Sequence, residues 1–345
     1  MPDADGQETG LLVLCAGFAV GKTGALAPLE PQPSVRLADE PAAAREHAST
    51  RFEADVALAK PRVDIIVVGS AIAPLGRPVR ELEVELGVGT LRKKLLVLGD
   101  RQRLLGGVHT RPEPFKRMPI VYERAYGGSD LRARNPRRHK IFAQNPVGVG
   151  FHGVASADPE VKSDLPNVER AVSHSTKVSD GPAGFGVIGR SWSPRRELAG
   201  TYDDAWVRTQ WPLPPRDFDS RHNQCAPLDQ QSRTLRGGED VRLVHMTLER
   251  EWRFLLPRLD VPVRLHFASR LETKQLEIDT VVIDADDRRV FVSARLAFAL
   301  TRTDPLREIV LGHVTSGWLR ARARSKLYRG PGPRPGTDRA RPAFR

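Results

Sequence analysis

The stretch that decides the fold reads RFEADVALAKPRVDIIVVGSAIAPLGRP over residues 51–78 and MPIVYERAYGG over residues 118–128. Its run VDIIVVG, residues 63–69, is almost wholly apolar, which is typical of a strand buried on both faces. The paired glycines Gly127 and Gly128 indicate a turn where the second segment ends. Charged side chains stand beside these apolar runs, where a plain β-scaffold does not require them. The stretch therefore predicts a β-core with charged groups close to it.

These charged residues come in both signs at the ends of the expected strands. Such a pattern predicts a buried or half-buried ionic network that fixes the geometry of the fold, and breaking one partner of a buried pair typically costs about 3–5 kcal/mol. A catalytic role for the same residues stays open as the alternative. The residues of this predicted network are Arg51, Asp55, Lys60, Asp64, Asp100, Arg101, Glu123 and Arg124.

Further strands follow from apolar alternation along the rest of the chain. ELEVEL at residues 81–86 and VPVRLHF at residues 261–267 each place apolar side chains on one face. LEIDTVVI and VFVSARLAFAL flank the turn-like segment 284–289 and predict a hairpin. The single helical pattern is AAAREHA at residues 42–48. We therefore expect a mainly β fold, with antiparallel sheets in a β-sandwich-like body, long irregular loops and little helix.

The net charge of +12 is concentrated at the C-terminal end of the 345 residues. Residues 319–345 hold nine Lys or Arg and one Asp, so that +8 of the charge falls in this Pro- and Gly-rich segment. Such a composition buries too little apolar surface to fold by itself. We expect a flexible N-terminus at 1–10, a β-rich domain at 11–318 and a basic flexible tail at 319–345. The tail is expected to be solvated, with weak polyanion binding as the alternative.

The cysteine content and hydropathy indicate a reduced, non-membrane environment. Cys15 and Cys225 are too few for a disulfide framework. The apolar run LLVLCAGFAV at residues 11–20 is too short to span a bilayer. We expect a cytoplasmic protein that does not contact a membrane.

Two short motifs imitate nucleotide-binding loops. AGFAVGKT at residues 16–23 fits a relaxed phosphate-binding loop in which Lys22 would reach the phosphates and Thr23 a magnesium ion. That chemistry needs a helix starting at the lysine, whereas several prolines follow, so a hairpin turn is the better interpretation. GFGVIG at residues 184–189 matches a dinucleotide fingerprint but follows no strand, which predicts a plain loop. We expect no cofactor.

Metal-binding and catalytic patterns are incomplete. His222 and Cys225 have a metal-like spacing, but no second pair lies at zinc-site distances. No G-x-S-x-G nucleophile elbow occurs, and the sequence does not show whether any two of its many acids converge. We therefore expect no metal and no complete catalytic constellation.

The periodicity fades over residues 129–215, which are rich in turn residues and prolines. Structureless stretches of this length in a compact domain are uncommon and are usually functional or disordered. The aromatic residues of this region argue against disorder. We expect ordered, irregular loops pinned to the β-body.

A series of distinctive blocks runs along the chain. The blocks are RFEADVALAKPRVDIIVVGSAIAPLGRP, VLGDR, PFKRMPIVYERAYGG, NPVGVGF, LPNVE, GFGVIGRSWSPRRELAGTYDDAWVRTQWPLPPRDFD and APLDQQ. In order and approximate spacing these blocks resemble the DUF2169 family of bacterial type VI secretion loci, and the resemblance runs from about residue 11 to about residue 318. The first strands and the Arg-rich tail depart from the family pattern.

The resemblance implies a non-enzymatic adaptor or chaperone. Such a protein would bind a type VI effector that contains or accompanies a PAAR domain, and would help to load it onto the VgrG spike. Aromatic and arginine side chains dominate the energetics of many interfaces, and the irregular region is rich in both. The residues expected to contact a partner are Phe151, Phe185, Trp192, Arg195, Arg196, Tyr202, Trp206, Trp211 and Phe218.

Two other classes of function remain open from the sequence. One is an enzyme of unknown substrate that uses clustered Asp, Glu and Arg residues. The other is a nucleotide- or polyanion-binding protein that uses Lys22 or the basic tail.

Overall fold

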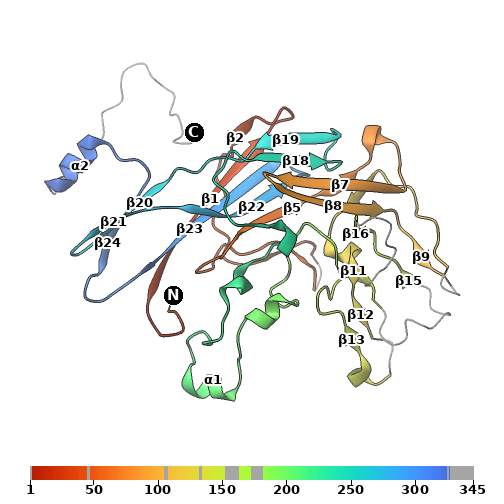
Figure 1. Cartoon of the computed structure of the whole chain (residues 1–345), viewed down its shortest axis with the longest axis horizontal. Helices are drawn as coiled ribbons and strands as arrows, with labels where there is room; N and C mark the ends of the chain where they lie inside the picture. The colour runs from red at the N-terminus through yellow and green to blue at the C-terminus, as the bar shows by residue number, and fades with distance from the viewer. Residues whose placement is uncertain are drawn as a thin grey trace.

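The computed structural model describes residues 2–44, 47–104, 108–131, 134–151, 163–171, 182–324 and 326. The fold is mostly β, with 40% strand and 11% helix, and most of its strand pairs are antiparallel. This confirms the fold class expected from the sequence. Figure 1 shows the two largest sheets together in the middle of the molecule.

The largest sheet has six strands in the order β17-β5-β22-β23-β1-β2. Its pairs are antiparallel except for β5 and β22, which run parallel from the pair Asp64–Thr280 onward. The predicted hairpin is present as β22 and β23. The strands are β1 (Thr9–Val20), β2 (Leu26–Pro28), β5 (Val63–Val68), β17 (Gln231–Ser232), β22 (Glu277–Asp284) and β23 (Arg289–Ala299).

A second, antiparallel sheet has five strands in the order β16-β8-β7-β18-β19. In β7 the predicted alternation holds, since Leu82, Val84 and Leu86 are buried while Glu81 and Glu83 are exposed. The apolar faces of both large sheets contribute to one hydrophobic core. The strands are β7 (Glu81–Val88), β8 (Leu91–Leu98), β16 (Val168–Arg170), β18 (Asp240–Val244) and β19 (Glu251–Leu255).

The position of β5 between two apolar clusters explains why its sequence does not alternate between apolar and polar residues. Ile65 and Val67 point into the main core, while Ile66 packs in a second apolar cluster with Phe52 and Val187. A strand covered on both faces buries every side chain, so all its positions favour apolar residues. The expectation of a doubly buried strand at residues 63–69 is therefore confirmed for Val63–Val68.

A third sheet of three strands has the order β21-β20-β24. Its buried side chains Val263, Leu265 and Phe267 belong to the main core. Figure 1 shows this sheet at one end of the molecule, beside the ends of β1 and β23. The strands are β20 (Pro262–Phe267), β21 (Leu271–Gln275) and β24 (Leu306–Leu311).

The remaining strands are short and belong to local pairs. They are β3 (Glu40–Pro41), β4 (Thr50–Phe52), β6 (Ser70–Ile72), β9 (Gln102–Arg103), β10 (Arg117–Pro119), β11 (Tyr126–Gly127), β12 (Ser129–Asp130), β13 (Lys140–Ile141), β14 (Val149–Gly150) and β15 (Ser163–Asp164). Short 3-10 turns occupy Pro74–Gly76, Tyr122–Arg124, Pro136–Arg138, Arg195–Leu198, Ser220–Asn223 and Leu228–Gln230.

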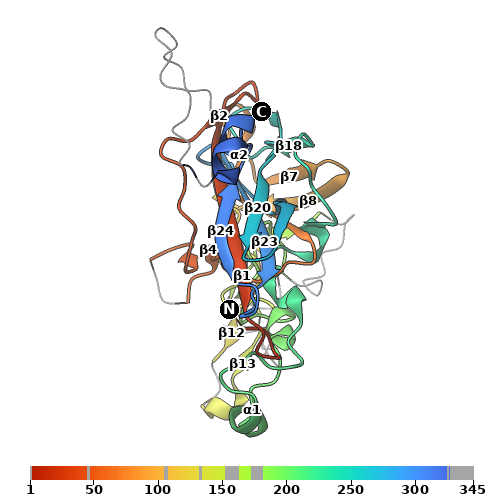
Figure 2. The ribbon, with the colours of Figure 1, turned by 90° about the vertical axis from the view of Figure 1, so that its left-hand side faces the viewer.

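The α-helices of the described residues are α1 (Asp204–Thr209) and α2 (Ser316–Ala323). Figures 1 and 2 place them far apart, with α1 at the lower end, away from the two largest sheets. The helix expected at residues 42–48 is wrong for its described part. Residues 42–44 form a bend, and the amide of Ala42 donates to the carbonyl of Ser49. Residues 45 and 46 lie outside the described residues. None of the described helices is long and apolar enough to cross a membrane.

Both ends of the chain contain some regular structure. The expected flexible N-terminus includes a turn in which the Asp3 carboxylate accepts from the amides of Asp5 and Gln7, and β1 begins at Thr9. The first part of the expected tail is helical, because α2 continues to Ala323. Apart from Arg324 and Lys326, the rest of that tail lies outside the described residues.

The irregular region is attached to the body by buried amide side chains. Asn145, which is fully buried, donates through Nδ2 to the carbonyls of Tyr122 (2.9 Å) and Tyr126 (3.0 Å). Asn167 donates through Nδ2 to the carbonyl of Leu98 at the end of β8 (3.1 Å). Such bonds satisfy backbone groups that have no partner in a sheet. The described part of the region is thus pinned to the β-body, as expected.

Candidate functional site

The predicted ionic residues Lys60 and Asp64 form a buried pair. Lys60 Nζ lies 2.8 Å from Asp64 Oδ2 and also donates to Thr280 Oγ1 at 2.9 Å. The side chain of Lys60 is 5% exposed and that of Asp64 is 0% exposed. Strand β5 carries Asp64 and β22 carries Thr280, so the pair fixes the point where these parallel strands meet.

A loop that is distant in sequence completes the environment of Asp64. Asp64 Oδ1 accepts from Gln224 Nε2 (2.7 Å) and from the amide of Ala226 (3.1 Å). Asp64 Oδ2 accepts from the amide of Cys225 (2.9 Å). Burial would raise the pKa of Asp64, but the Lys60 charge and these donors hold it below its ordinary value. Burial would lower the pKa of Lys60, but the acidic groups of Cys225 and Asp64 raise it. Both groups are therefore charged at neutral pH.

The other residues of the predicted network form separate clusters. Arg124 contacts Asp100 at 3.0 Å, while no further pair of the predicted set is bonded among the described contacts. The outside partners are Asp284 for Arg51, Ser293 and Arg36 for Asp55, Glu169 for Arg101, and Ser49 for Glu123. The structure thus brings together two pairs and distributes the remaining four residues over the body.

Two buried ion pairs were missed by the sequence reasoning. Arg295 on β23 contacts Asp279 on β22 through Nε and Nη2, and it donates to the carbonyl of Ala57 at 2.8 Å. Arg195 Nη2 lies 2.7 Å from Glu53 Oε1, with both side chains nearly buried. Asp279 and Arg295 lie on the two strands of the predicted hairpin. Glu53 and Arg195 are 142 positions apart, and sequence spacing carries no signal for their contact.

Lys93 on β8 has a shifted pKa, but all its N–H groups are already hydrogen-bonded. Burial lowers the pKa of Lys93 to about 8, against the raising effect of Asp229. Its Nζ donates to Asp229 Oδ1 (2.8 Å), Gln230 Oε1 (2.7 Å) and the carbonyl of Gly184 (2.8 Å). Three acceptors use all three N–H groups of an ammonium. The geometry therefore gives Lys93 a structural role in holding two loops to the five-stranded sheet.

Both motifs that imitate nucleotide-binding loops lack the required helix. Residues 16–23 comprise the end of β1 and a tight turn into β2, in which the amide of Gly21 donates to the carbonyl of Ala25 at 2.8 Å. The expected hairpin turn is confirmed. GFGVIG at residues 184–189 lies in an irregular loop, as expected.

The metal-like pair of His222 and Cys225 is used for structure. His222 Nδ1 lies 2.8 Å from the carbonyl of Arg195, and Cys225 Sγ contacts Asp64 Oδ2 at 3.3 Å. Burial raises the pKa of Cys225 well above its ordinary value. In the part of the chain that the structure describes, no three His, Cys, Asp or Glu side chains gather in a metal-binding arrangement.

Three of the residues expected to contact a partner lie in the interior. Phe185 is 0% exposed, Trp192 is 5% exposed and Arg195 is 4% exposed. Trp192 packs edge-on against Tyr122 with ring centroids 5.3 Å apart. The expectation of surface contact is wrong for these three. The irregular region folds back, so that Phe185 and Trp192 fill the core and Arg195 forms its buried ion pair with Glu53.

The remaining residues that were expected to contact a partner lie at or near the surface. Phe151 is half-buried in a cluster with Tyr126 and Phe142, and Phe218 packs edge-on against His222. Arg196 is exposed. Tyr202, Trp206 and Trp211 all belong to residues 200–219, the α1 loop.

The α1 loop presents an exposed apolar surface. Tyr202 is 59% exposed, Val207 58% and Trp211 66%. Trp206 is half-buried, and its ring centroid lies 4.8 Å from that of Tyr202. Its Nε1 donates to the carbonyl of Leu213 at 3.1 Å, which ties the two limbs of the loop together. Val207 has no aromatic signal, so the sequence reasoning missed it.

The base of the α1 loop is closed by hydrogen bonds. Asp217 accepts from the amide and the hydroxyl of Thr201 (3.0 and 2.7 Å). Asp203 caps α1 by accepting from the amide of Trp206 at 2.8 Å. Gln210 Nε2 donates to the carbonyl of Ala4, which attaches the loop to the N-terminal turn. The exposed aromatic groups therefore sit on an ordered element that projects from the body (Figure 1).

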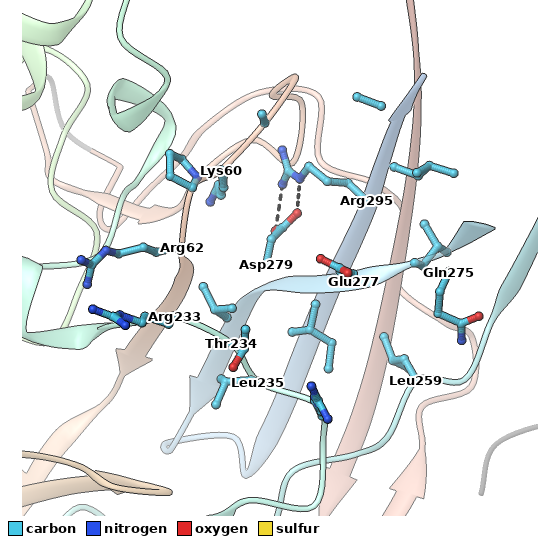
Figure 3. Close-up of a pocket in the computed structure, with 18 of the residues that line it drawn as sticks. Lys60, Arg62, Arg233, Thr234, Leu235, Leu259, Gln275, Glu277, Asp279 and Arg295 are labelled. Atoms are coloured by element: carbon cyan, nitrogen blue, oxygen red, sulfur yellow. Dashed lines mark hydrogen bonds and ion pairs between the residues drawn. The ribbon is translucent and has the colours of Figure 1, made fainter. Parts of the chain in front are cut away.

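A groove of about 800 Å³ is lined in part by Lys60 and its neighbours in sequence. Figure 3 shows Lys60, Arg62 and Arg233 on one side and Glu277 and Gln275 on the other. The groove separates residues 58–63 and 233–236 from the adjoining parts of β21, β22 and β23. Among the described residues, the groove and the α1 loop are the candidate binding surfaces.

Comparison with known proteins identifies a family. The model of the family described as "Uncharacterized protein conserved in bacteria (DUF2169)" matches residues 5–295. This range begins earlier and ends earlier than the resemblance expected from the blocks. No curated protein and no solved structure matches the chain significantly. Since the family model covers most of the 345 residues, the chain belongs to the DUF2169 family.

Proposed function

We propose that this protein is a cytoplasmic adaptor that binds an effector of a bacterial type VI secretion system. The effector contains a PAAR domain or accompanies one, and the adaptor helps to load it onto the VgrG spike. In this proposal the protein acts through binding and performs no chemistry. Membership of the DUF2169 family supports the proposal together with the exposed surface of the α1 loop.

The observation that carries the proposal is the exposure of Tyr202, Val207 and Trp211 on a fixed element. Exposed aromatic side chains contribute little to the stability of the free protein. On a partner they bury a large apolar area, and Trp and Tyr are the residues most enriched at binding hot spots. Because hydrogen bonds already hold the base of the loop, binding loses less conformational entropy than ordering a free segment would.

Co-expression tests this proposal directly. The full chain, carrying a tag, is expressed with the products of the neighbouring genes and purified. We expect one toxin-like neighbour, or its PAAR-associated region, to remain bound through size-exclusion chromatography. If every neighbour is lost while the adaptor elutes as a folded protein, the adaptor function is contradicted.

A further inference from the structure

The groove in Figure 3 borders an unpaired portion of a central strand. Strand β22 begins at Glu277, but β5 pairs with it only from Thr280 onward. On the side of β5, the described residues provide no strand neighbour for Glu277, Ile278 and Asp279. The segment before β5, residues 58–62, lines the opposite wall of the groove. The position that a continuation of β5 would fill is therefore a groove.

The walls of the groove carry cationic side chains that are not neutralised. Arg62, Arg233 and Arg236 are exposed, and no carboxylate of the described residues lies within ion-pair distance of any of them. Lys60 and Arg295, by contrast, are already paired with Asp64 and Asp279. These three guanidinium groups create a positive potential over the groove that favours an anionic ligand.

Lys274 and Glu277 add one charge of each sign at the rim. Lys274 Nζ lies 3.7 Å from Glu272 Oε2, which is a loose contact for an ion pair. Glu277 is exposed on β22 and lines the groove. Its carboxylate repels any negative charge of a ligand that lies close to it. A ligand with separated negative charges avoids this repulsion.

The lining of the groove favours a peptide over a nucleic acid. Apolar side chains such as Leu235, Leu259 and Leu296 lie among the charged ones and suit aliphatic groups. None of the described lining residues is aromatic, whereas single-stranded nucleic acids bind largely by stacking bases on aromatic side chains. An extended peptide also uses backbone hydrogen bonds when it lies beside an open strand.

We propose that the groove binds an extended acidic segment of a partner protein, which lies beside the first residues of β22. Its acidic side chains contact Arg62, Arg233 and Arg236, and its apolar side chains contact the leucines of the lining. The tail of this chain is not the occupant, because it is itself strongly basic. The groove is separate from the α1 loop, so the inference does not depend on the proposed adaptor function.

A synthetic peptide tests this inference on the full chain. The probe is a capped peptide of about eight residues in which Glu and Val alternate, which spans roughly 26 Å as a strand. Its affinity is measured by fluorescence anisotropy at several salt concentrations. We expect binding that weakens as salt increases, and no binding of the matching Lys–Val peptide. A wild-type protein that fails to bind the Glu–Val peptide would overturn the inference.

Charge-reversal variants locate the binding. The triple variant Arg62→Glu, Arg233→Glu, Arg236→Glu is expected to weaken peptide binding by at least about tenfold. Its control is Arg77→Glu, Arg302→Glu, Arg307→Glu, which makes the same charge change at exposed arginines outside the groove. The control is expected to bind within about threefold of the wild type, beyond the general effect of net charge. Circular dichroism is used to check that both variants fold.

Two results would contradict the peptide assignment. Equal losses in the two triple variants would mean that net charge attracts the peptide and that the groove has no specific role. Binding of an oligo-dT probe as tight as that of the peptide, with the same sensitivity to the groove variant, would make the groove a general polyanion site.

A peptide methylated on alternate backbone amides is expected to bind more weakly, because it loses its hydrogen bonds to β22.

Discussion

At the scale of single residues, the charges beside the apolar strands serve as connectors. Asp64 accepts from the Lys60 ammonium, from three N–H groups of residues 224–226 and from the Cys225 thiol. A buried carboxylate is costly unless such donors surround it, and here they also bring a distant loop against β5. For Lys60 and Asp64, the charges seen in the sequence thus have a structural role in the body.

The variant Asp64→Asn is expected to destabilise the fold because it leaves the Lys60 ammonium buried without a counter-charge. The free energy of unfolding, measured in urea at pH 7, should fall by about 3–5 kcal/mol. Since the pKa of Asp64 is held below its ordinary value of 3.8, its contribution is complete above that pH and is lost as the pH falls through the lower value. The difference from the wild type should therefore narrow only below about pH 3.8.

An exposed pair provides the control for this prediction. Lys94 and Glu83 lie 2.7 Å apart with about half of each side chain exposed. Glu83→Gln should leave the unfolding free energy nearly unchanged, because solvent screens such pairs. Equal effects of Asp64→Asn and Glu83→Gln would contradict the role assigned to the buried pair.

Substitution of Gly128 tests the turn that the sequence pair Gly127–Gly128 predicts. It has φ +104°, and a Cβ at this position would lie 2.4 Å from the carbonyl oxygen of Gly148. Gly76 has φ +65° with nothing within 4 Å of its Cβ position. We expect Gly76→Ala to cost about 1–2 kcal/mol from the backbone conformation alone and Gly128→Ala to cost clearly more. Thermal unfolding of both variants measures the difference, and equal shifts in Tm would argue against the close approach.

At the scale of elements, the strands and the loops differ in what their sequences reveal. Apolar alternation and the fully apolar run predict β5, β7 and the hairpin of β22 and β23, because the period of a strand is local. The attachment of Gln230 to the carbonyl of Ile65 joins residues 165 positions apart, and no local period encodes such a contact. For the same reason the sequence could not distinguish buried Trp192 from exposed Trp211 within one proline-rich region.

The hydrogen bonds of Gln230 allow the contribution of such an attachment to the stability of the fold to be measured. Its Nε2 donates to the carbonyls of Ile65 (2.7 Å) and Phe185 (2.9 Å), and its Oε1 accepts from Lys93. Gln230→Leu leaves these buried groups without partners and should reduce the unfolding free energy by about 1–3 kcal/mol or more. The exposed Gln102, bonded to Asp164, offers Gln102→Leu as the control with little expected effect. Urea unfolding that fails to separate the two variants would count against the attachment.

At the scale of the whole molecule, the body and the α1 loop differ in how they place their aromatic side chains. Three sheets form the body, and the irregular region packs its buried aromatic side chains against them. The α1 loop projects from this body and keeps Tyr202 and Trp211 exposed. A scaffold that positions one fixed apolar surface suits the recognition of a partner protein, which is the central claim of the proposed function.

The affinity for the effector tests this claim most directly. The double variant Tyr202→Ser, Trp211→Ser removes the two exposed aromatic side chains, and Leu37→Ser, Leu248→Ser removes two leucines that are 81% and 85% exposed elsewhere. With the purified effector in isothermal titration, we predict that Kd rises by about 30-fold or more for the α1-loop variant and changes little for the control. An unchanged Kd for a folded Tyr202→Ser, Trp211→Ser variant would contradict the claim that the α1 loop binds the effector.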